Sequence, residues 1–332
     1  MKTFRSLFTN PWFVFAIVLY IGSLFVLSQR AEFSLSEALI ELVIFGIAFP
    51  LLAWLATIRA RSLIIRVHPT GYEMLALLAY VVALSVYLAF GPQAIDSSLP
   101  QDWIASDRIR FFITLGKKLL IFVALPLVIF RLAWRYSVRD FGFQRDGLRE
   151  LGRTHLPIVL IASCAVLAFN YFFGGAAAPL REGKLSTSQL LAGIPLCFIW
   201  LTIEAGLVEE FFFRAFLQTR LSVWFRSEIT GVVLMSMIFG LAHAPGFIFR
   251  HAGAVEGLGA NPTALDAIAY SIATLAISGV FFGVIWARTK NLFALVLVHA
   301  ATDLFPNLSD FVKAWSLGRR WRDGSQRSQL QL

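Results

Sequence analysis

Hydrophobic residues along this chain fall into long runs that are separated by short polar segments. Most runs approach the ~17–25 apolar residues with which an α-helix crosses a bilayer. The runs are 13–27, 39–58, 74–90, 111–132, 156–173, 190–217, 229–243, 267–287 and 292–304. Strands are excluded because open sheet edges cannot lie in lipid. The pattern therefore predicts an all-α fold, a polytopic membrane helix bundle with eight or nine transmembrane helices.

Three of these runs are less regular than the others. Lys117 and Lys118 interrupt the run 111–132, and the run 292–304 is short. The run 13–27 follows Lys2 and Arg5, as the apolar part of a signal peptide would. No small-x-small cleavage site follows that run, so it is predicted to be an uncleaved first helix.

Composition supports the membrane assignment. Of the 332 residues, 58% are hydrophobic and only 15% are charged, whereas a soluble domain is about a quarter charged. The net charge of +9 is spread over short segments between the runs and is not gathered on one soluble surface. The expected surroundings are therefore membrane lipids, and no nucleic acid partner is expected.

The basic residues also predict an orientation. Lys and Arg concentrate in segments 59–66, 135–153, 220–226 and 288–290, which all fall on one side of the membrane if the N-terminus does too. That side is predicted to be cytoplasmic, which gives a multi-pass protein of the plasma (inner) membrane if the source is bacterial. Segment 135–153 itself is interpreted as a solvated loop.

The basic C-terminal tail does not fit this alternation. After nine crossings its arginines would lie outside, so either one run does not span or segment 308–317 lies along the surface. The residues concerned are Arg319, Arg320, Arg322 and Arg327.

The run 190–217 carries the charges that are hardest to explain by packing. Glu209-Glu210-Phe-Phe-Phe-Arg214 places three ionisable groups in an apolar helix, where charge is costly and usually functional. Glu210 and Arg214 are i, i+4 neighbours and are predicted to form an ion pair. Glu209 projects about 100° away and is left available for chemistry. The alternative is an ion pair with a purely structural role between helices.

Two further clusters place histidines in apolar helices. Phe239-Gly-Leu-Ala-His243 ends one run, and His299-Ala-Ala-Thr-Asp303 puts an imidazole and a carboxylate on one helix face. Alone, each histidine could simply be a hydrogen-bonding residue between helices. A helical rise of ~1.5 Å per residue, however, puts Glu209 and both histidines at similar depth, about 14–22 Å from the cytoplasmic ends. One intramembrane cavity could therefore receive all of them.

Other polar residues and the thiols receive ordinary structural interpretations. Glu204 is interpreted as structural, although it could face the same cavity. The remaining histidines, His68, His155 and His251, are predicted to lie at the surface, and Cys164 and Cys197 are predicted to be packed thiols without a disulfide.

Taken together, Glu-Glu-x-x-x-Arg, Phe-x-x-x-His and His-x-x-x-Asn/Asp on successive hydrophobic helices resemble the CPBP intramembrane endopeptidases. This family includes the type II CAAX prenyl endopeptidases. The resemblance covers about a third of the chain, from Leu190 to Asp303. It divides the sequence into N-terminal helices of unknown role (1–187), a protease core (188–305) and a basic tail (306–332).

The resemblance implies a catalytic set of Glu209, Glu210, His243, His299 and Asp303. Glu209 and His243 would activate water for peptide hydrolysis, while His299 and Asp303 would stabilise the oxyanion. Glu210, paired with Arg214, would hold the catalytic helix in register.

The final position of the third motif departs from the pattern of the prenyl-protein enzymes, which typically have Asn where this chain has Asp303. An Asn can donate directly to an oxyanion, whereas Asp303 is expected to orient His299 as the donor. This departure argues against a prenylated CAAX substrate more than it argues against protease chemistry. The implied substrate is a peptide or protein, lipidated in the case of a CAAX protein.

Cofactor and functional class leave alternatives open. The resemblance favours a glutamate mechanism without a cofactor, and the alternative is a zinc ion held by Glu209, His243 and His299. The same buried charges could also serve an ion- or proton-coupled transporter or channel. A membrane scaffold without catalytic activity is the third possibility.

Overall fold

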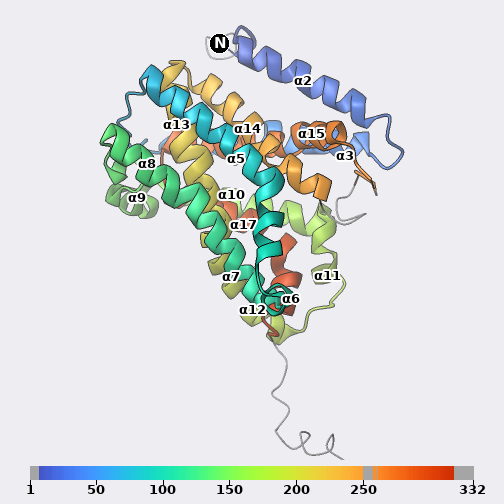
Figure 1. Cartoon of the computed structure of the whole chain (residues 1–332). Helices are drawn as coiled ribbons and strands as arrows, with labels where there is room; N and C mark the ends of the chain where they lie inside the picture. Colours follow the sequence, from blue (N-terminus) through green and yellow to red (C-terminus); the bar gives the residue numbers. More distant parts are fainter. Residues whose placement is uncertain (1–6, 250–256, 260, 318–332) are drawn as a thin grey trace, which may run out of the picture.

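The computed structural model describes residues 7–249, 257–259 and 261–317, and these residues form helices joined by short connections, with no strand among them (Figure 1). Segments labelled η are not α-helical: Val138–Phe141 and Gly175–Ala177 are 3₁₀ helices, and the others are π-helical. In chain order the helices are α2 (Pro11–Leu27), α3 (Leu35–Glu41), η1 (Leu42–Ala48), α4 (Phe49–Ala56), α5 (Gly71–Ser98), α6 (Gln101–Ala105), α7 (Asp107–Lys118), η2 (Leu119–Ala124), α8 (Leu125–Trp134), η3 (Val138–Phe141), α9 (Arg145–Glu150), η4 (Leu151–His155), α10 (Leu156–Phe173), η5 (Gly175–Ala177), α11 (Ala178–Arg181), α12 (Thr187–Leu201), η6 (Thr202–Leu207), η7 (Glu210–Gln218), α13 (Thr219–Trp224), α14 (Glu228–Phe249), α15 (Ala264–Ala273), α16 (Leu275–Thr289) and α17 (Leu292–Ala314).

Within the described residues, eight continuous helical segments are long and apolar enough to cross a membrane. They include Asp107–Trp134 and Leu292–Ala314, which correspond to the two interrupted or short runs. The helix α2 is shorter, and it lies at one edge of the bundle, where it packs on α14 and α15 (Figure 1). The predicted all-α membrane bundle is confirmed. Lys2 and Arg5 lie outside the described residues.

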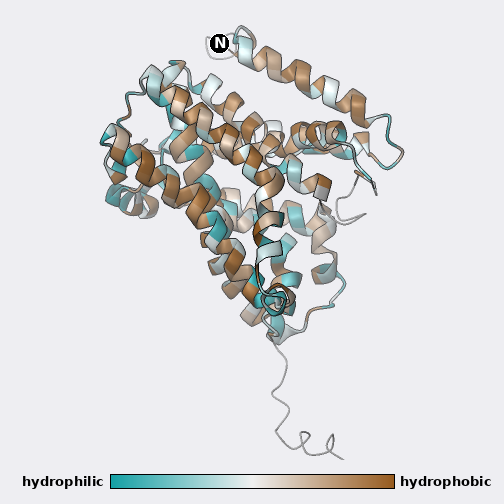
Figure 2. Ribbon diagram, viewed as in Figure 1, coloured by the Kyte–Doolittle hydropathy of each residue, from teal (hydrophilic) through white to brown (hydrophobic). Residues whose placement is uncertain are grey.

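The second half of the chain forms the centre of the bundle. In Ala264–Thr289, 61% of the most apolar window is buried, whereas only 11% is buried in Gly71–Ser98 and in Asp107–Trp134. Helix α5 exposes Leu75, Leu78 and Val82, and hydrophobic residues cover the outward faces of the surrounding helices (Figure 2). Such a surface is suited to lipid. The motif-bearing helices are therefore enclosed by the N-terminal ones.

The basic segments meet at one end of the bundle. The backbone amide of Leu63 donates to the carbonyl of Thr289 at 2.9 Å. The side-chain amide of Asn291 donates to the carbonyl of Gly147 at 2.8 Å. Lys290 pairs with Glu228 at 2.8 Å. These contacts place the segments around residues 63, 147, 228 and 290 on the same side, as their charge predicts.

Segment 135–153 is not merely a solvated loop. Phe141 is fully buried and stacks on Phe211 and Phe216 of the helix that carries the first motif. Gly142 has φ of 88°, and a Cβ at this position would lie 3.0 Å from the Cβ of Ala215. The interpretation as a loop was wrong because a few apolar residues between the arginines point inward and cover the helix.

Two single-residue predictions were also wrong. His155 is fully buried. One ring nitrogen lies 2.9 Å from the carbonyl oxygen of Arg61, and the other lies 2.7 Å from the side-chain amide of Asn291. Cys164 is exposed on α10, whereas Cys197 is buried. His68 is exposed, as predicted, and His251 lies outside the described residues.

Helix α17 continues past the third motif without a break. Leu308, Phe311 and Val312 are buried and pack in one cluster with Cys197 and Leu201 of α12. The suggestion of a separate surface segment is therefore wrong for residues 308–314. The tail arginines from Arg319 onward lie outside the described residues.

A buried ion pair ties α5 to the helix that carries the first motif. Arg220 Nε lies 2.8 Å from Glu73 Oε1, and both side chains are fully buried. The hydroxyl of Tyr136 donates to Glu73 Oε2 at 2.8 Å. Burial and this hydrogen bond raise the pKa of Tyr136 to about 12, so the phenol keeps its proton and remains a donor.

Candidate active site

The first motif lies on a helix with widened turns. Segments η6 and η7 are π-helical and flank Glu209. Such i→i+5 turns are uncommon and occur frequently at functional sites. A Cβ at Gly206 would lie only 2.7 Å from the carbonyl oxygen of Val296 on α17. The absence of a side chain at Gly206 thus allows the close approach that brings the first motif to His299.

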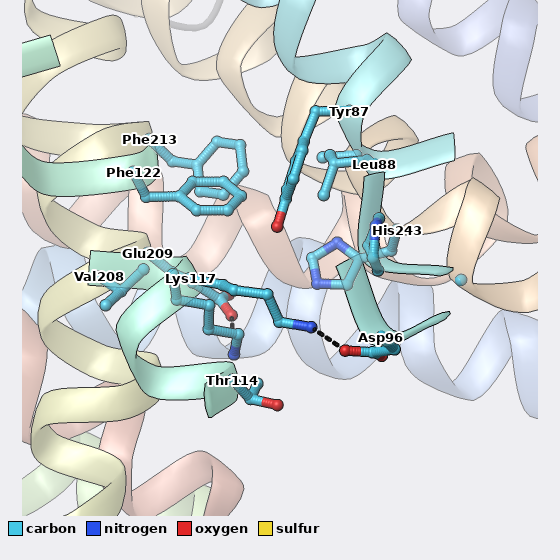
Figure 3. A pocket seen from close by; sticks show the side chains of 14 residues that line it. Tyr87, Leu88, Asp96, Thr114, Lys117, Phe122, Val208, Glu209, Phe213 and His243 are labelled. Carbon is cyan, nitrogen blue, oxygen red and sulfur yellow. Dashed lines mark hydrogen bonds and ion pairs between the residues drawn. The ribbon is translucent and has the colours of Figure 1, made fainter. Parts of the chain in front are cut away.

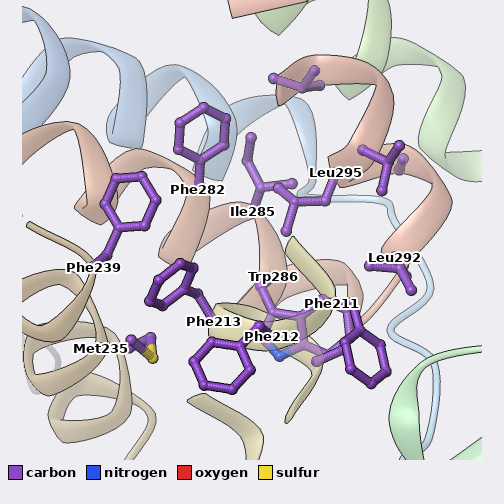
Figure 4. Packing of buried hydrophobic residues seen from close by; sticks show 14 of the residues in the cluster. Phe211, Phe212, Phe213, Met235, Phe239, Phe282, Ile285, Trp286, Leu292 and Leu295 are labelled. Carbon is purple, nitrogen blue, oxygen red and sulfur yellow. The ribbon is translucent and has the colours of Figure 1, made fainter. Parts of the chain in front are cut away.

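Aromatic packing fixes this helix from several sides. Phe211, Phe212 and Phe213 are at most 2% exposed. Phe213 meets Phe239 of α14 edge to face with centroids 5.1 Å apart, and the same cluster includes Trp286 of α16 (Figure 4). The three consecutive phenylalanines project in different directions around the wide turn. They therefore hold the two glutamates at a fixed rotation in the bundle.

Glu210 and Arg214, one turn apart on this helix, are both fully buried. Arg214 Nε lies 3.6 Å from Glu210 Oε2, and the guanidinium carbon lies 4.6 Å from the centroid of the Phe239 ring. One terminal nitrogen of Arg214 also lies 3.5 Å from the carbonyl of Gly279. The guanidinium is thus enclosed by one carboxylate, aromatic faces and a backbone carbonyl.

His299 lies among three carboxylates. Its Nδ1 is 2.5 Å from Glu210 Oε1, while its Nε2 is 3.4 Å from Asp303 Oδ2 and 3.7 Å from Glu209 Oε2. Its ring stacks on Phe282 with centroids 4.9 Å apart. Glu210, rather than Asp303, is the carboxylate closest to this imidazole. Both distances from Nε2 exceed a good hydrogen bond, and because Nδ1 donates to Glu210, Nε2 carries a hydrogen for a substrate oxygen only when the ring is the imidazolium.

His243 is held by its own helix. Its Nδ1 lies 2.8 Å from the carbonyl oxygen of Phe239, one turn earlier, and its ring packs on that of Phe239. Because a carbonyl oxygen only accepts, Nδ1 must carry the hydrogen. In the neutral ring, Nε2 therefore has a free lone pair.

A cavity of about 490 Å³ lies between the first-motif helix, α14, α5 and the helical segment that begins with α7. Glu209 and His243 both line it, together with the rings of Tyr87, Phe122 and Phe213 (Figure 3). The cavity is thus bounded by side chains from four spanning segments. Of the predicted residues, Glu209 and His243 face the cavity, whereas Glu210 and His299 are almost completely buried behind it.

Two lysines in the cavity lining, Lys117 and Lys118, were not predicted to have a chemical role. Lys118 Nζ lies 2.6 Å from Glu204 Oε1 and 3.7 Å from Glu209 Oε1. The only signal in the sequence was that Lys117 and Lys118 interrupt a hydrophobic run. The ammonium group of Lys117 instead pairs with Asp96 at 2.8 Å (Figure 3).

No three His, Cys, Asp or Glu side chains in the described residues are grouped as metal ligands would be. His299 Nδ1 already faces Glu210, and His243 Nδ1 faces a backbone carbonyl. Both Nε2 atoms stay available, and an Nδ1–H held by a carboxylate or a carbonyl is also the usual orientation of a metal-bound histidine, so the zinc set of Glu209, His243 and His299 stays an alternative to the glutamate mechanism.

Comparison with known proteins gives one family. The sequence pattern of the family described as Rce1-like, type II CAAX prenyl endopeptidase, matches residues 191–305. No curated protein and no solved structure matches the chain. The matched segment begins in α12, ends in α17 and contains all three motifs, so it includes every residue of the predicted catalytic set. Residues 191–305 are therefore similar to the type II CAAX prenyl endopeptidases of the Rce1-like family, the family that the three motifs predict.

Proposed function

We propose that this protein is an intramembrane endopeptidase that hydrolyses a peptide bond with water activated by Glu209 and His243. The observation that carries the proposal is that both side chains line one cavity between membrane-spanning helices. The match of residues 191–305 to a protease family supports the same reaction class.

In this proposal Glu209 removes a proton from a water molecule, and the lone pair on His243 Nε2 orients that water. The hydroxide attacks the scissile carbonyl carbon to form a C–O bond, and the oxyanion accepts a hydrogen bond from Nε2 of the protonated His299 ring. Asp303 and Glu210 keep the His299 ring in place. When the C–N bond breaks, Glu209 returns the proton to the leaving amine.

We further propose that the substrate is a peptide or protein segment presented from within the membrane. The cavity has aromatic walls around Tyr87, Phe122 and Phe213, and its lining also includes polar side chains, namely Asp96, Thr114, Lys117, Lys118, Glu209 and His243. We expect the N-terminus and the basic end of the bundle to face the cytoplasm, according to the rule that cytoplasmic loops are enriched in Lys and Arg.

The proposal is tested with purified protein in lipid vesicles and membrane-anchored peptides, offered with and without a farnesyl group. We expect a new peptide C-terminus, which in ¹⁸O-labelled water carries one ¹⁸O atom per cleavage because the oxygen comes from water. The pair of peptides shows whether a prenyl group is required. Dissipation of a proton gradient by the same vesicles without any cleavage would instead support the transporter alternative.

Metal dependence gives a separate prediction. We expect cleavage to persist after exhaustive treatment with a chelator, because Glu209 and His243 suffice to activate water in this mechanism. The measurement is the initial rate before and after chelation, with the zinc content of the same sample determined by elemental analysis. One tightly held zinc per chain, with activity lost on chelation and restored by zinc, would overturn the mechanism.

A further inference from the structure

Lys118 is a cation in the wall of the cavity that the mechanism above does not use. Its ammonium group lies 2.6 Å from Glu204 Oε1, 3.5 Å from the carbonyl oxygen of Glu204 and 3.7 Å from Glu209 Oε1. Its side chain is 29% exposed, and it lines the cavity together with Glu209. One ammonium group therefore faces two carboxylates of the first-motif helix.

The widened turns explain how both carboxylates reach the same cation. Glu204 and Glu209 are five residues apart, which on a regular α-helix would separate their directions by about 140°. The i→i+5 turns of the π-helical segment Thr202–Leu207 are wider, so this angle is smaller for Glu204 and Glu209, which follows two residues after the segment ends. The local helix geometry thus aligns Glu204 and Glu209 on the face that meets Lys118.

Glu209 itself lies between two nitrogen groups. Lys118 Nζ is 3.7 Å from one carboxylate oxygen, and His299 Nε2 is 3.7 Å from the other. Both distances are too long for good hydrogen bonds but short enough for electrostatic attraction. Glu204 holds Lys118 by the shorter contact, so the ammonium does not close onto Glu209.

We infer that Lys118 is a positioning residue that keeps Glu209 ionised and directed into the cavity, and that Glu204 holds Lys118 at the required distance. This inference rests on the proposed function, because it assigns the pair a role in the reactivity of the general base. Lys117 has no such role, since its ammonium pairs with Asp96.

The test compares Lys118→Met, Lys118→Arg and Lys117→Met in the full-length protein in vesicles. We expect Lys118→Met to lower kcat about 10- to 100-fold with little change in KM, as misplacement of a catalytic group does. Lys118→Arg, which keeps the charge, should recover most of kcat. Lys117→Met should retain a kcat at least several-fold above that of Lys118→Met.

Two further measurements separate this role from a purely structural one. In a double-mutant cycle, Glu204→Gln should lower kcat in the wild-type background but add nothing to Lys118→Met, because Glu204 acts through Lys118. A hydrophobic carbodiimide, which reacts with protonated carboxyl groups, should label Glu209 faster in Lys118→Met than in the wild-type protein. This second readout requires no substrate.

The outcomes also distinguish the inference from the proposed function. If the wild-type protein cleaves and Glu209→Gln does not, but Lys118→Met retains wild-type kcat and labelling, the inference fails while the protease assignment stands. If the wild-type protein cleaves nothing and Lys118→Met still accelerates labelling of Glu209, the pairing stands while the protease assignment fails. If Lys118→Met does not fold, equal kcat values for Lys118→Arg, Glu204→Gln and the wild type would overturn the inference.

Discussion

Replacement of Glu209 by Gln is expected to reduce kcat by about 10²- to 10⁴-fold, the usual contribution of one general base. Gln keeps the size of the side chain at the cavity wall but cannot accept the proton of the attacking water. Initial rates in vesicles and thermal unfolding of the same preparation measure the two effects separately. We expect the folded yield to be unchanged, because Glu209 makes no short hydrogen bond whose loss would strand a partner in the described part of the structure.

Glu182→Gln is a suitable control for this substitution. Glu182 is an exposed carboxylate that pairs with Lys184 at 2.6 Å, far in sequence from the three motifs. Its replacement should leave kcat unchanged, whereas His243→Ala should resemble Glu209→Gln. Combining Glu209→Gln with His243→Ala should cost little more than either alone, since the two act on one water. Turnover at the wild-type rate by Glu209→Gln would refute its assignment as the base.

Replacement of Arg214 by Ala is expected to destabilise the folded protein by about 3–5 kcal/mol, the typical cost of breaking a buried ion pair. The guanidinium is fully buried, and its removal leaves Glu210 without its arginine counter-charge. It also leaves a cavity between Phe239 and Phe282, whose rings contact the guanidinium. Folded yield after detergent extraction and the apparent melting temperature measure the loss.

The double variant Glu210→Ala/Arg214→Ala provides the comparison. It removes both charges, so no unpaired carboxylate remains in the low-dielectric interior, and it should melt above Arg214→Ala. It should nevertheless be catalytically impaired, because Glu210 also holds His299 Nδ1 at 2.5 Å. An unchanged melting temperature for Arg214→Ala would show that the ion pair contributes nothing to stability.

The helical architecture could be predicted because length and hydropathy alone determine which segments cross a membrane. The gathering of Glu209, His243 and His299 followed from their common depth. Lys118 and Glu204 could not be assigned, because their meeting depends on a π-helical turn and on which helices are neighbours. The contact of Glu210 with His299 was missed for a related reason. Sequence spacing pointed to Asp303, whereas the close approach at Gly206 brings a carboxylate from another helix nearer.

The inward turn of segment 135–153 shows a different limit. Five of its residues are arginines, which dominate its average hydropathy and favour a solvated interpretation. The place of this segment in the fold depends on a few residues, such as Phe141 and Gly142, that fit the surface of the first-motif helix. Averages over a window cannot detect such positions. A glycine with positive φ beside a buried aromatic residue becomes informative only after the neighbouring helix has been placed.

The position of Arg214 also matters during biosynthesis. His299 follows its contact Glu210 by 89 residues, so it has not yet been synthesised when the first-motif helix leaves the ribosome. Arg214 follows Glu210 by only four residues, and Lys118 precedes both glutamates. The first-motif helix therefore has positive partners before α17 is synthesised. Arg214 lies on the same helix, and Lys118 lies on a helix made earlier. The ion pair of the finished protein is thus also the one that can neutralise Glu210 while the chain is entering the bilayer.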